Sequence, residues 1–140
     1  MKLKIIGTIS TVIIFIAACQ SEESLEFKRY YSSGALVYQS HCQNCHGDNG
    51  EGLSALIPPL NDSTYLIKNK AELACSIKSG LKGPVVIKGK TFDDAMPTND
   101  LSPIEIAQVL TYVGNSFGNK LNTIDEQEVQ TDLAKCKLVR

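Results

Sequence analysis

The residues with the clearest chemical potential are two cysteines and a histidine in the run Cys42-Gln43-Asn44-Cys45-His46. The spacing C-x-x-C-H is the attachment signature of haem c, in which both thiols add to the vinyl groups and the histidine binds the iron. Two thiols three positions apart lie on one side of a helical turn, and the next residue can project its imidazole over the same porphyrin face. The motif therefore predicts one covalent haem c with His46 as an axial ligand.

Three other interpretations of this motif are a redox-active pair, a zinc site and chance. A thioredoxin-like C-x-x-C is expected between a strand and a helix, whereas residues 34–40 look helical. A zinc site would also need Cys75 and Cys136, which lie 61 residues apart instead of forming a second close pair. A signal for export argues against chance occurrence of the C-x-x-C-H motif, because haem c is attached outside the cytoplasm in bacteria.

The N-terminus has such an export pattern. Lys2 and Lys4 precede an apolar run over residues 5–16. This run is shorter than the roughly 20 apolar residues of a membrane span and is followed by polar residues, so it predicts a signal peptide.

The end of the apolar run predicts a lipid anchor. Ile16-Ala17-Ala18-Cys19 resembles the bacterial lipobox, in which cleavage leaves a lipid-modified cysteine. Ordinary cleavage, with Cys19 incidental, is the alternative. We expect export to the periplasmic face of a bacterial membrane, with a signal peptide over residues 1–18, a lipid-anchored tether over residues 19–31 and a folded domain over residues 32–140.

The other axial position of the iron needs a second ligand, and Met96 is the candidate. It is the only methionine left once the signal peptide is removed, and it lies in a polar loop 50 residues after His46, directly before Pro97. Met/His ligation raises the reduction potential of haem. His41 is the rival, but it lies five residues before His46 on the same segment and so cannot reach the opposite face.

The last two cysteines, Cys75 and Cys136, are expected to form a disulfide, because leftover thiols usually pair in an oxidising compartment. Helical spacing places Cys136 on one face with Val129 and Leu133, and Cys75 on the inner side of another short helix. In the chain-entropy model, closing a loop of about 60 residues stabilises a domain by roughly 4 kcal/mol.

The remaining chain predicts a mostly α protein of short helices joined by long loops. Ser102-Pro103-Ile104-Glu105 is a strong helix start, with a capping box and proline at the first helical position. The other expected elements are helices over 34–41 and 69–79, a loop over 47–52, a small hairpin of 85–87 and 91–92 around 88–90, and a last helix from about 123 that carries Cys136.

Over about residues 32–117 the sequence resembles the monohaem class I cytochromes c, and among them bacterial lipoprotein cytochromes. In that family, a glycine eight residues and an aromatic residue four residues before the first haem cysteine pack the N-terminal helix against the C-terminal one. Gly34 and Tyr38 match, and Val109 with Tyr112 looks like the facing pair. The resemblance implies the class I fold, with short helices wrapped around one haem; here a small hairpin precedes the methionine ligand.

The family also has a proline whose carbonyl accepts a hydrogen bond from the axial histidine, which fixes the ring. Pro58-Pro59-Leu60 resembles its P-x-L pattern, with Pro58 the better match and Pro59 left open. The hairpin before Met96 and the tail after Asn122 depart from the general pattern.

The function implied is outer-sphere, one-electron transfer, with redox proteins or a membrane oxidoreductase complex as partners. The alternatives are an electron-relay subunit of a larger oxidoreductase and, less favoured, a peroxidase-like haem enzyme. A formal net charge of −1 gives no nucleic-acid character, and the sequence does not fix the oligomeric state. A local excess of lysines suits either a docking rim for an acidic partner or an ordinary solvated surface; these are Lys68, Lys70, Lys78, Lys82, Lys88 and Lys90.

Overall fold

The computed structural model describes residues 25–136. The predicted signal peptide and the lipidated Cys19 lie outside the described residues. A helix over residues 25–41 leads directly into the haem-attachment motif. The other elements are α2 (Gln43–His46), α3 (Ser63–Lys68), α4 (Lys70–Ser79), β1 (Val85–Ile87), β2 (Lys90–Phe92), α5 (Pro103–Gly114) and α6 (Glu126–Lys135).

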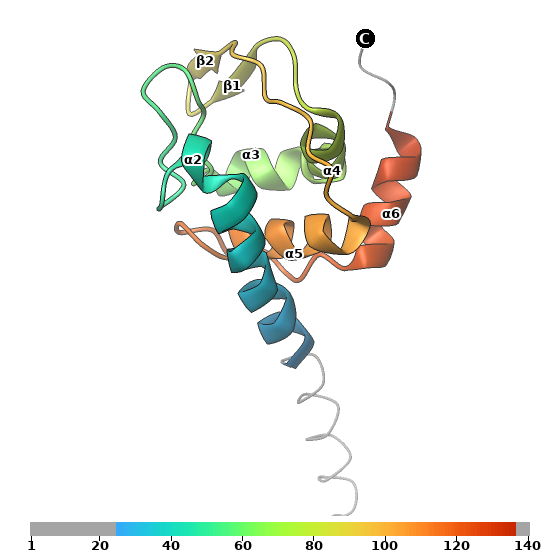
Figure 1. The fold of residues 1–140 in the computed structure, drawn as a ribbon. Helices are drawn as coiled ribbons and strands as arrows, with labels where there is room; N and C mark the ends of the chain where they lie inside the picture. Colours follow the sequence, from blue (N-terminus) through green and yellow to red (C-terminus); the bar gives the residue numbers. More distant parts are fainter. Residues whose placement is uncertain (1–24, 137–140) are drawn as a thin grey trace, which may run out of the picture.

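Helix α5 lies at the centre of the fold, and the other helices are arranged around it (Figure 1). The helix over residues 25–41 crosses α5 on one side, while α4 and α6 pack against it and against each other. The residues of α5 contribute to two buried clusters. One contains Ile106, Ala107 and Leu110 with Ala74 and Val129, and the other contains Val109 and Val113 with Tyr38 and Leu66. The predicted mostly α, class I cytochrome c architecture is confirmed.

The folded part begins earlier than the boundary expected at residue 32. Residues 25–31 are helical, and Tyr30 is only 8% exposed within the core. Tyr31 packs against Tyr112 with ring centroids 5.2 Å apart and shares a 3.0 Å hydrogen bond with Ser116. The charged residues of this stretch suggested a solvated tether, but its aromatic residues fall at helical spacing and gain burial against α5.

The helix expected over residues 69–79 is present as α4, and a further helix, α3, which was not predicted, precedes it. Asp62 caps α3 by accepting hydrogen bonds from the backbone of Thr64 (3.0 Å) and Tyr65 (3.2 Å). Asn69 then ends α3 and begins α4. The Asp-Ser-Thr start was therefore an N-cap signal that the sequence analysis missed.

The small hairpin is confirmed. β1 and β2 pair antiparallel with Val85 opposite Phe92 and Ile87 opposite Lys90. Lys88 and Gly89 between them have φ angles of 51° and 74°. A two-residue turn with positive φ at both positions matches the twist of the flanking strands.

Helix α6 begins later than the sequence predicted. It was expected from about residue 123, but its N-cap is Asp125, which accepts a hydrogen bond from Glu128 N at 2.8 Å. Ile124 is tied to α5 instead, because its backbone N donates to Thr111 Oγ1 at 3.0 Å and its carbonyl accepts from the same hydroxyl at 3.1 Å. Both residues are buried, so these bonds hold the extended chain until the helix begins.

The start of α5 gives a pH prediction. Glu105 Oε2 accepts hydrogen bonds from Ser102 Oγ (2.5 Å) and Ser102 N (2.8 Å), which lower the pKa of the carboxyl group. A lowered folded-state pKa means that this stabilisation is present above the usual Glu pKa of about 4.3 and is lost as the pH falls through the folded value. We expect Glu105→Gln to be less stable than the wild type at neutral pH and the difference to close in acid, as measured by urea unfolding. A difference that is independent of pH would contradict this assignment.

Candidate haem-binding site

The attachment motif is fixed by the crossing of its helix with α5. A Cβ at Gly34 would lie 2.6 Å from the carbonyl carbon of Gln108 and 2.9 Å from Tyr112 Cβ. Tyr38, one turn later, is 1% exposed, packs against Tyr112 and donates a 2.6 Å hydrogen bond to Gly47 O. The predicted packing of Gly34 and Tyr38 against α5 is confirmed, and it sets where the motif begins and ends.

The motif itself is a single turn of helix. The backbone N groups of Cys45 and His46 both donate to Cys42 O, at 3.1 and 2.9 Å. Cys42 is half-buried, whereas Cys45 is exposed. Burial, with a smaller contribution from the neighbouring Cys45, raises the pKa of the Cys42 thiol to about 11.

His46 is 8% exposed, and its Nδ1 lies 3.1 Å from Pro58 O. The carbonyl at hydrogen-bond distance is thus that of Pro58, the better match of the two prolines. Burial lowers the pKa of His46, and the bond to Pro58 opposes this only in part. A neutral ring that donates from Nδ1 keeps a lone pair on Nε2, which is the state in which imidazole binds a metal.

His46 opens onto an apolar pocket of about 820 Å³ of empty space, including the part open to solvent. A concave, mostly apolar lining with a few polar groups is typical of cofactor sites. The pocket brings together Cys42, His46, Pro58 and Met96, whereas Cys45 is not among the residues that line it. Its walls come from Leu60, Leu66, Leu73, Ile77, Leu81 and Val109.

Met96 is placed by a short backbone pairing with the chain that follows α4. Leu81 N donates to Met96 O at 3.0 Å, and Met96 N donates to Leu81 O at 2.9 Å. Gly80 directly before has φ 74° and ψ 177°, a conformation that is essentially restricted to glycine. A Cβ there would also lie 2.6 Å from Met96 O, so the glycine permits this close approach.

Replacing Gly80 tests that packing. We expect Gly80→Ala to destabilise the protein by more than Gly83→Ala does, because its methyl group meets Met96 O in addition to the about 1–3 kcal/mol that a strained backbone costs. Gly83→Ala is the matched control, because Gly83 also has positive φ but a Cβ there meets nothing within 4 Å. Chemical unfolding of both variants measures the difference. Equal losses would show that conformation alone, and not contact with Met96, makes Gly80 necessary.

Comparison with known proteins decides the family. Residues 30–113 match the family model described as cytochrome c oxidase, cbb3-type, subunit III. The chain belongs to this family of c-type cytochrome domains. Two curated relatives, both named cytochrome c-552 and both from Thermus thermophilus, are each 30% identical over 93 residues. The match covers 63% of this chain and 70% of the first relative. It covers 62% of the second relative, which is less than two thirds of that protein. The family match and the two relatives support a monohaem cytochrome c that functions in haem-based electron transfer.

The residues of this cytochrome fit the haem that the family implies. The pocket is mainly apolar, as a porphyrin requires, and a neutral imidazole nitrogen and a thioether are both soft enough to bind haem iron. His46 is the only histidine among the residues that line the pocket in the described part of the chain, while His41 is exposed and outside it. Within residues 25–136, no three His, Cys, Asp or Glu side chains are grouped as a metal site.

Several residues of the cytochrome site were missed by sequence reasoning. Leu66 lies on α3, which was not predicted, and Leu73 and Ile77 lie one turn apart on α4. Buried Asn119 donates to Leu60 O (2.8 Å) and Val113 O (2.9 Å) and so ties the wall residue Leu60 to the end of α5. The i, i+4 spacing could have indicated the α4 pair, but nothing local in the sequence indicates the role of Asn119.

Proposed function

We propose that this protein is an exported electron carrier with one haem c, covalently attached through Cys42 and Cys45 and axially ligated by His46 and Met96. The observation that carries the proposal is that His46 and Met96, 50 residues apart in the chain, line the same apolar pocket while His46 Nδ1 is committed to Pro58 O. When bound, haem supplies a reversible one-electron couple, and the protein tunes its potential and access.

The chain's own residues keep the site ready for electron transfer. The bond from His46 to Pro58 holds the imidazole in one tautomer and orientation. The pairing of Leu81 with Met96 holds the thioether side of the pocket. Ligands held on both sides need little rearrangement between oxidation states, and the apolar walls restrict water.

The decisive experiment is to express the full chain in a bacterium that attaches haem c and to purify it from the membrane fraction. Pyridine haemochrome analysis should show one haem per chain, bound through two thioether bonds. A potentiometric titration should follow a single one-electron step. A non-haem metal protein would give no haemochrome. A peroxidase-like enzyme would bind carbon monoxide or peroxide readily in the wild type.

We further propose that Cys19 carries lipid and holds the protein at the periplasmic face of the membrane. The support is the lipobox-like sequence before Cys19. No helix within residues 25–136 is both long and apolar enough for a membrane crossing. Cys19→Ser should move the haem protein from the membrane to the periplasmic fraction. Mass spectrometry of the N-terminal peptide checks that the signal peptide of the variant has been removed, and a cleaved variant that stays membrane-bound would show that the anchor is not this cysteine.

A role as an electron-relay subunit of a larger oxidoreductase is the second candidate, and the matching family description favours it. Affinity capture from native membranes under mild detergent tests this role. Recovery of a stoichiometric membrane complex would support a subunit, and recovery of the cytochrome alone would support a free carrier.

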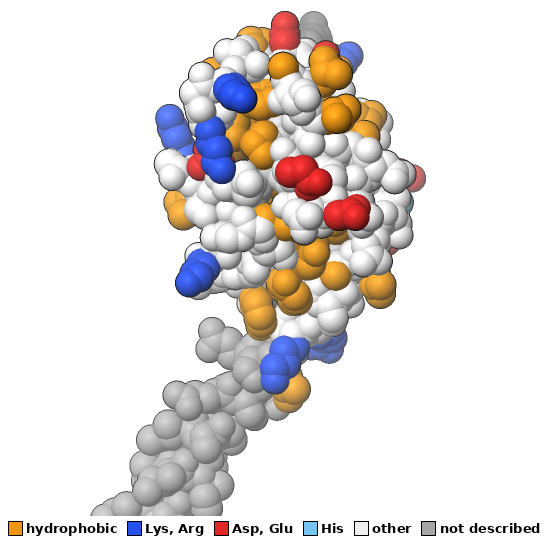
Figure 2. Space-filling view, turned by 90° about the vertical axis from the view of Figure 1, so that its left-hand side faces the viewer, with side chains coloured by type: hydrophobic (Ala, Val, Ile, Leu, Met, Phe, Trp, Pro, Cys, Tyr) orange, Lys and Arg blue, Asp and Glu red, His pale blue; other side chains and the backbone are white. Residues whose placement is uncertain are grey.

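Two of the lysines noted in the sequence, Lys82 and Lys90, suit docking by an acidic redox partner. Lys70 and Lys78 are already paired, with Glu128 and Asp100, and Lys88 donates to Asn61 Oδ1. Lys82 is exposed and follows the pocket residue Leu81 directly. Lys90 is exposed on β2. Figure 2 shows Lys and Arg side chains along one edge of a face that also exposes apolar side chains. Electron transfer with an acidic partner should slow as ionic strength rises; a salt-independent rate would argue against docking by charge.

A further inference from the structure

Helix α4 supports the whole segment that carries Met96. Its end leads to the pairing between Leu81 and Met96, and Ile77 O accepts a 3.1 Å hydrogen bond from Asn99 N. Lys78 Nζ donates to Leu101 O at 2.9 Å and to Asp100 Oδ1 at 3.2 Å. The end of α4 and the residues just after it therefore hold residues 96–101, the methionine segment, by hydrogen bonds at several points.

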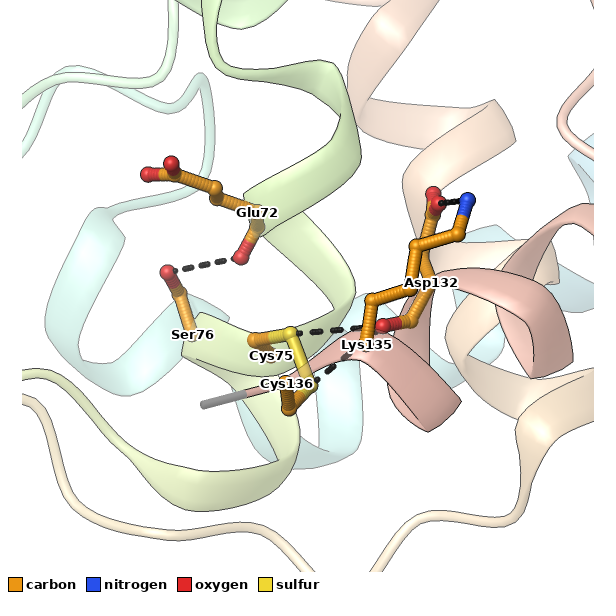
Figure 3. Close-up of a disulfide and its surroundings, with 6 residues drawn as sticks. All are labelled: Glu72, Cys75, Ser76, Asp132, Lys135 and Cys136. Atoms are coloured by element: carbon orange, nitrogen blue, oxygen red, sulfur yellow. Dashed lines mark hydrogen bonds and ion pairs between the residues drawn. A yellow bond between two sulfur atoms is a disulfide. The ribbon is translucent and has the colours of Figure 1, made fainter. Parts of the chain in front are cut away.

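The face of α4 turned away from the pocket is covered by the C-terminal segment. Cys75 on α4 is joined by a disulfide to Cys136, the C-cap of α6, with Cα atoms 5.7 Å apart (Figure 3). At the other end of α4, Lys70 Nζ lies 2.6 Å from Glu128 Oε1. Ala74 and Val129 between these two links are each 1% exposed.

The C-terminal segment is itself fixed to the central helix. Thr111 holds Ile124 through two hydrogen bonds before α6 begins. Residues 124–136 thus run from α5 along the outer side of α4 and end covalently on Cys75. A displacement of α4 away from the pocket would have to break the disulfide or move all of these contacts.

We propose that residues 124–136 form a clamp that holds Met96 against the iron, with Cys75 and Cys136 as positioning residues. This inference rests on the proposed His46/Met96 ligation. The clamp acts through α4, which links the disulfide on its outer face to the methionine segment at its end. Loss of the clamp raises the fraction of molecules in which the thioether has left the iron.

An added ligand measures that fraction. Imidazole can bind ferric haem only where Met96 has dissociated, so its apparent affinity scales with the population of the open state. We expect Cys75→Ser/Cys136→Ser to bind imidazole about tenfold more tightly than the wild type, which corresponds to ~1.4 kcal/mol. Lys135→Ala is the control on the same helix, because its only ion pair among the described residues is a 3.8 Å contact with Asp132; it should leave the affinity unchanged.

General destabilisation must be separated from loss of the clamp. The comparison uses the wild type in urea. The urea concentration is chosen so that the free energy of unfolding of the wild type equals that of the double variant without urea. If the clamp acts on Met96, the double variant binds imidazole more tightly than this stability-matched wild type. Equal affinities would overturn the proposal.

A second preparation avoids dependence on folding of the variant. Tris(2-carboxyethyl)phosphine reduces the disulfide of the wild-type holoprotein to two thiols, taking up an oxygen from water to become the phosphine oxide. The thiols are alkylated with iodoacetamide and the iron is reoxidised with ferricyanide before imidazole is added. Tighter binding supports the clamp, and wild-type affinity with both thiols alkylated contradicts it. Absence of the methionine-to-iron charge-transfer band in the untreated wild type would instead refute the proposed ligation.

Discussion

Met96→Ala should let carbon monoxide bind the ferrous protein at once and should lower the reduction potential by on the order of 100 mV, part of the roughly 0.8 V that axial ligands span. The thioether is a soft ligand that favours ferrous iron, so its loss stabilises the ferric state. The charge-transfer band of methionine-ligated ferric haem should disappear in the same variant. Optical spectroscopy and potentiometric titration measure all three effects.

His41→Ala is the matched control for the Met96 variant. His41 is exposed and outside the pocket, so its replacement should leave the band, the potential and carbon monoxide binding unchanged. A band that survives in Met96→Ala, or vanishes in His41→Ala, would show that the second ligand has been assigned to the wrong residue.

The local motifs were the part of the site most accessible to sequence reasoning. Cys42, Cys45 and His46 lie within five consecutive residues, so their geometry follows from one turn of helix. Gly34 and Tyr38 were found because family spacing relates them to Cys42. The hairpin and the start of α5 were found because turn residues and the capping box have strong local preferences.

The features missed depend on contacts between distant segments. Tyr30 directly follows the charged Lys28 and Arg29 in sequence, and its packing against α5 makes this stretch part of the fold. Asn119 has no local signature, because its partners Leu60 and Val113 come from two other segments. The last helix was expected from about residue 123, but hydrogen bonds to Thr111 hold Ile124 and the helix begins only after its N-cap, Asp125. Local propensity was overruled by tertiary contact in each case.

Gly34→Ala should destabilise the holoprotein by about 3 kcal/mol, at the upper end of overpacking costs. The new methyl group would meet the Gln108 carbonyl group and Tyr112 Cβ. The Gln108 atoms belong to the backbone of α5 and cannot move aside by a change of rotamer. The two helices would have to separate, which would also disturb Tyr38 and the start of the haem motif.

The sign of this effect separates packing from helix propensity. Alanine is favoured over glycine by about 1 kcal/mol in a helix interior, so propensity alone predicts that Gly34→Ala stabilises the protein. Leu36→Ala on the same helix is the control, because Leu36 is 65% exposed and its replacement should change stability by no more than about 0.5 kcal/mol. Urea unfolding of the three holoproteins measures the differences. A Gly34→Ala protein as stable as the wild type would mean that the crossing does not depend on close backbone contact, and the placement of the haem motif would need another cause.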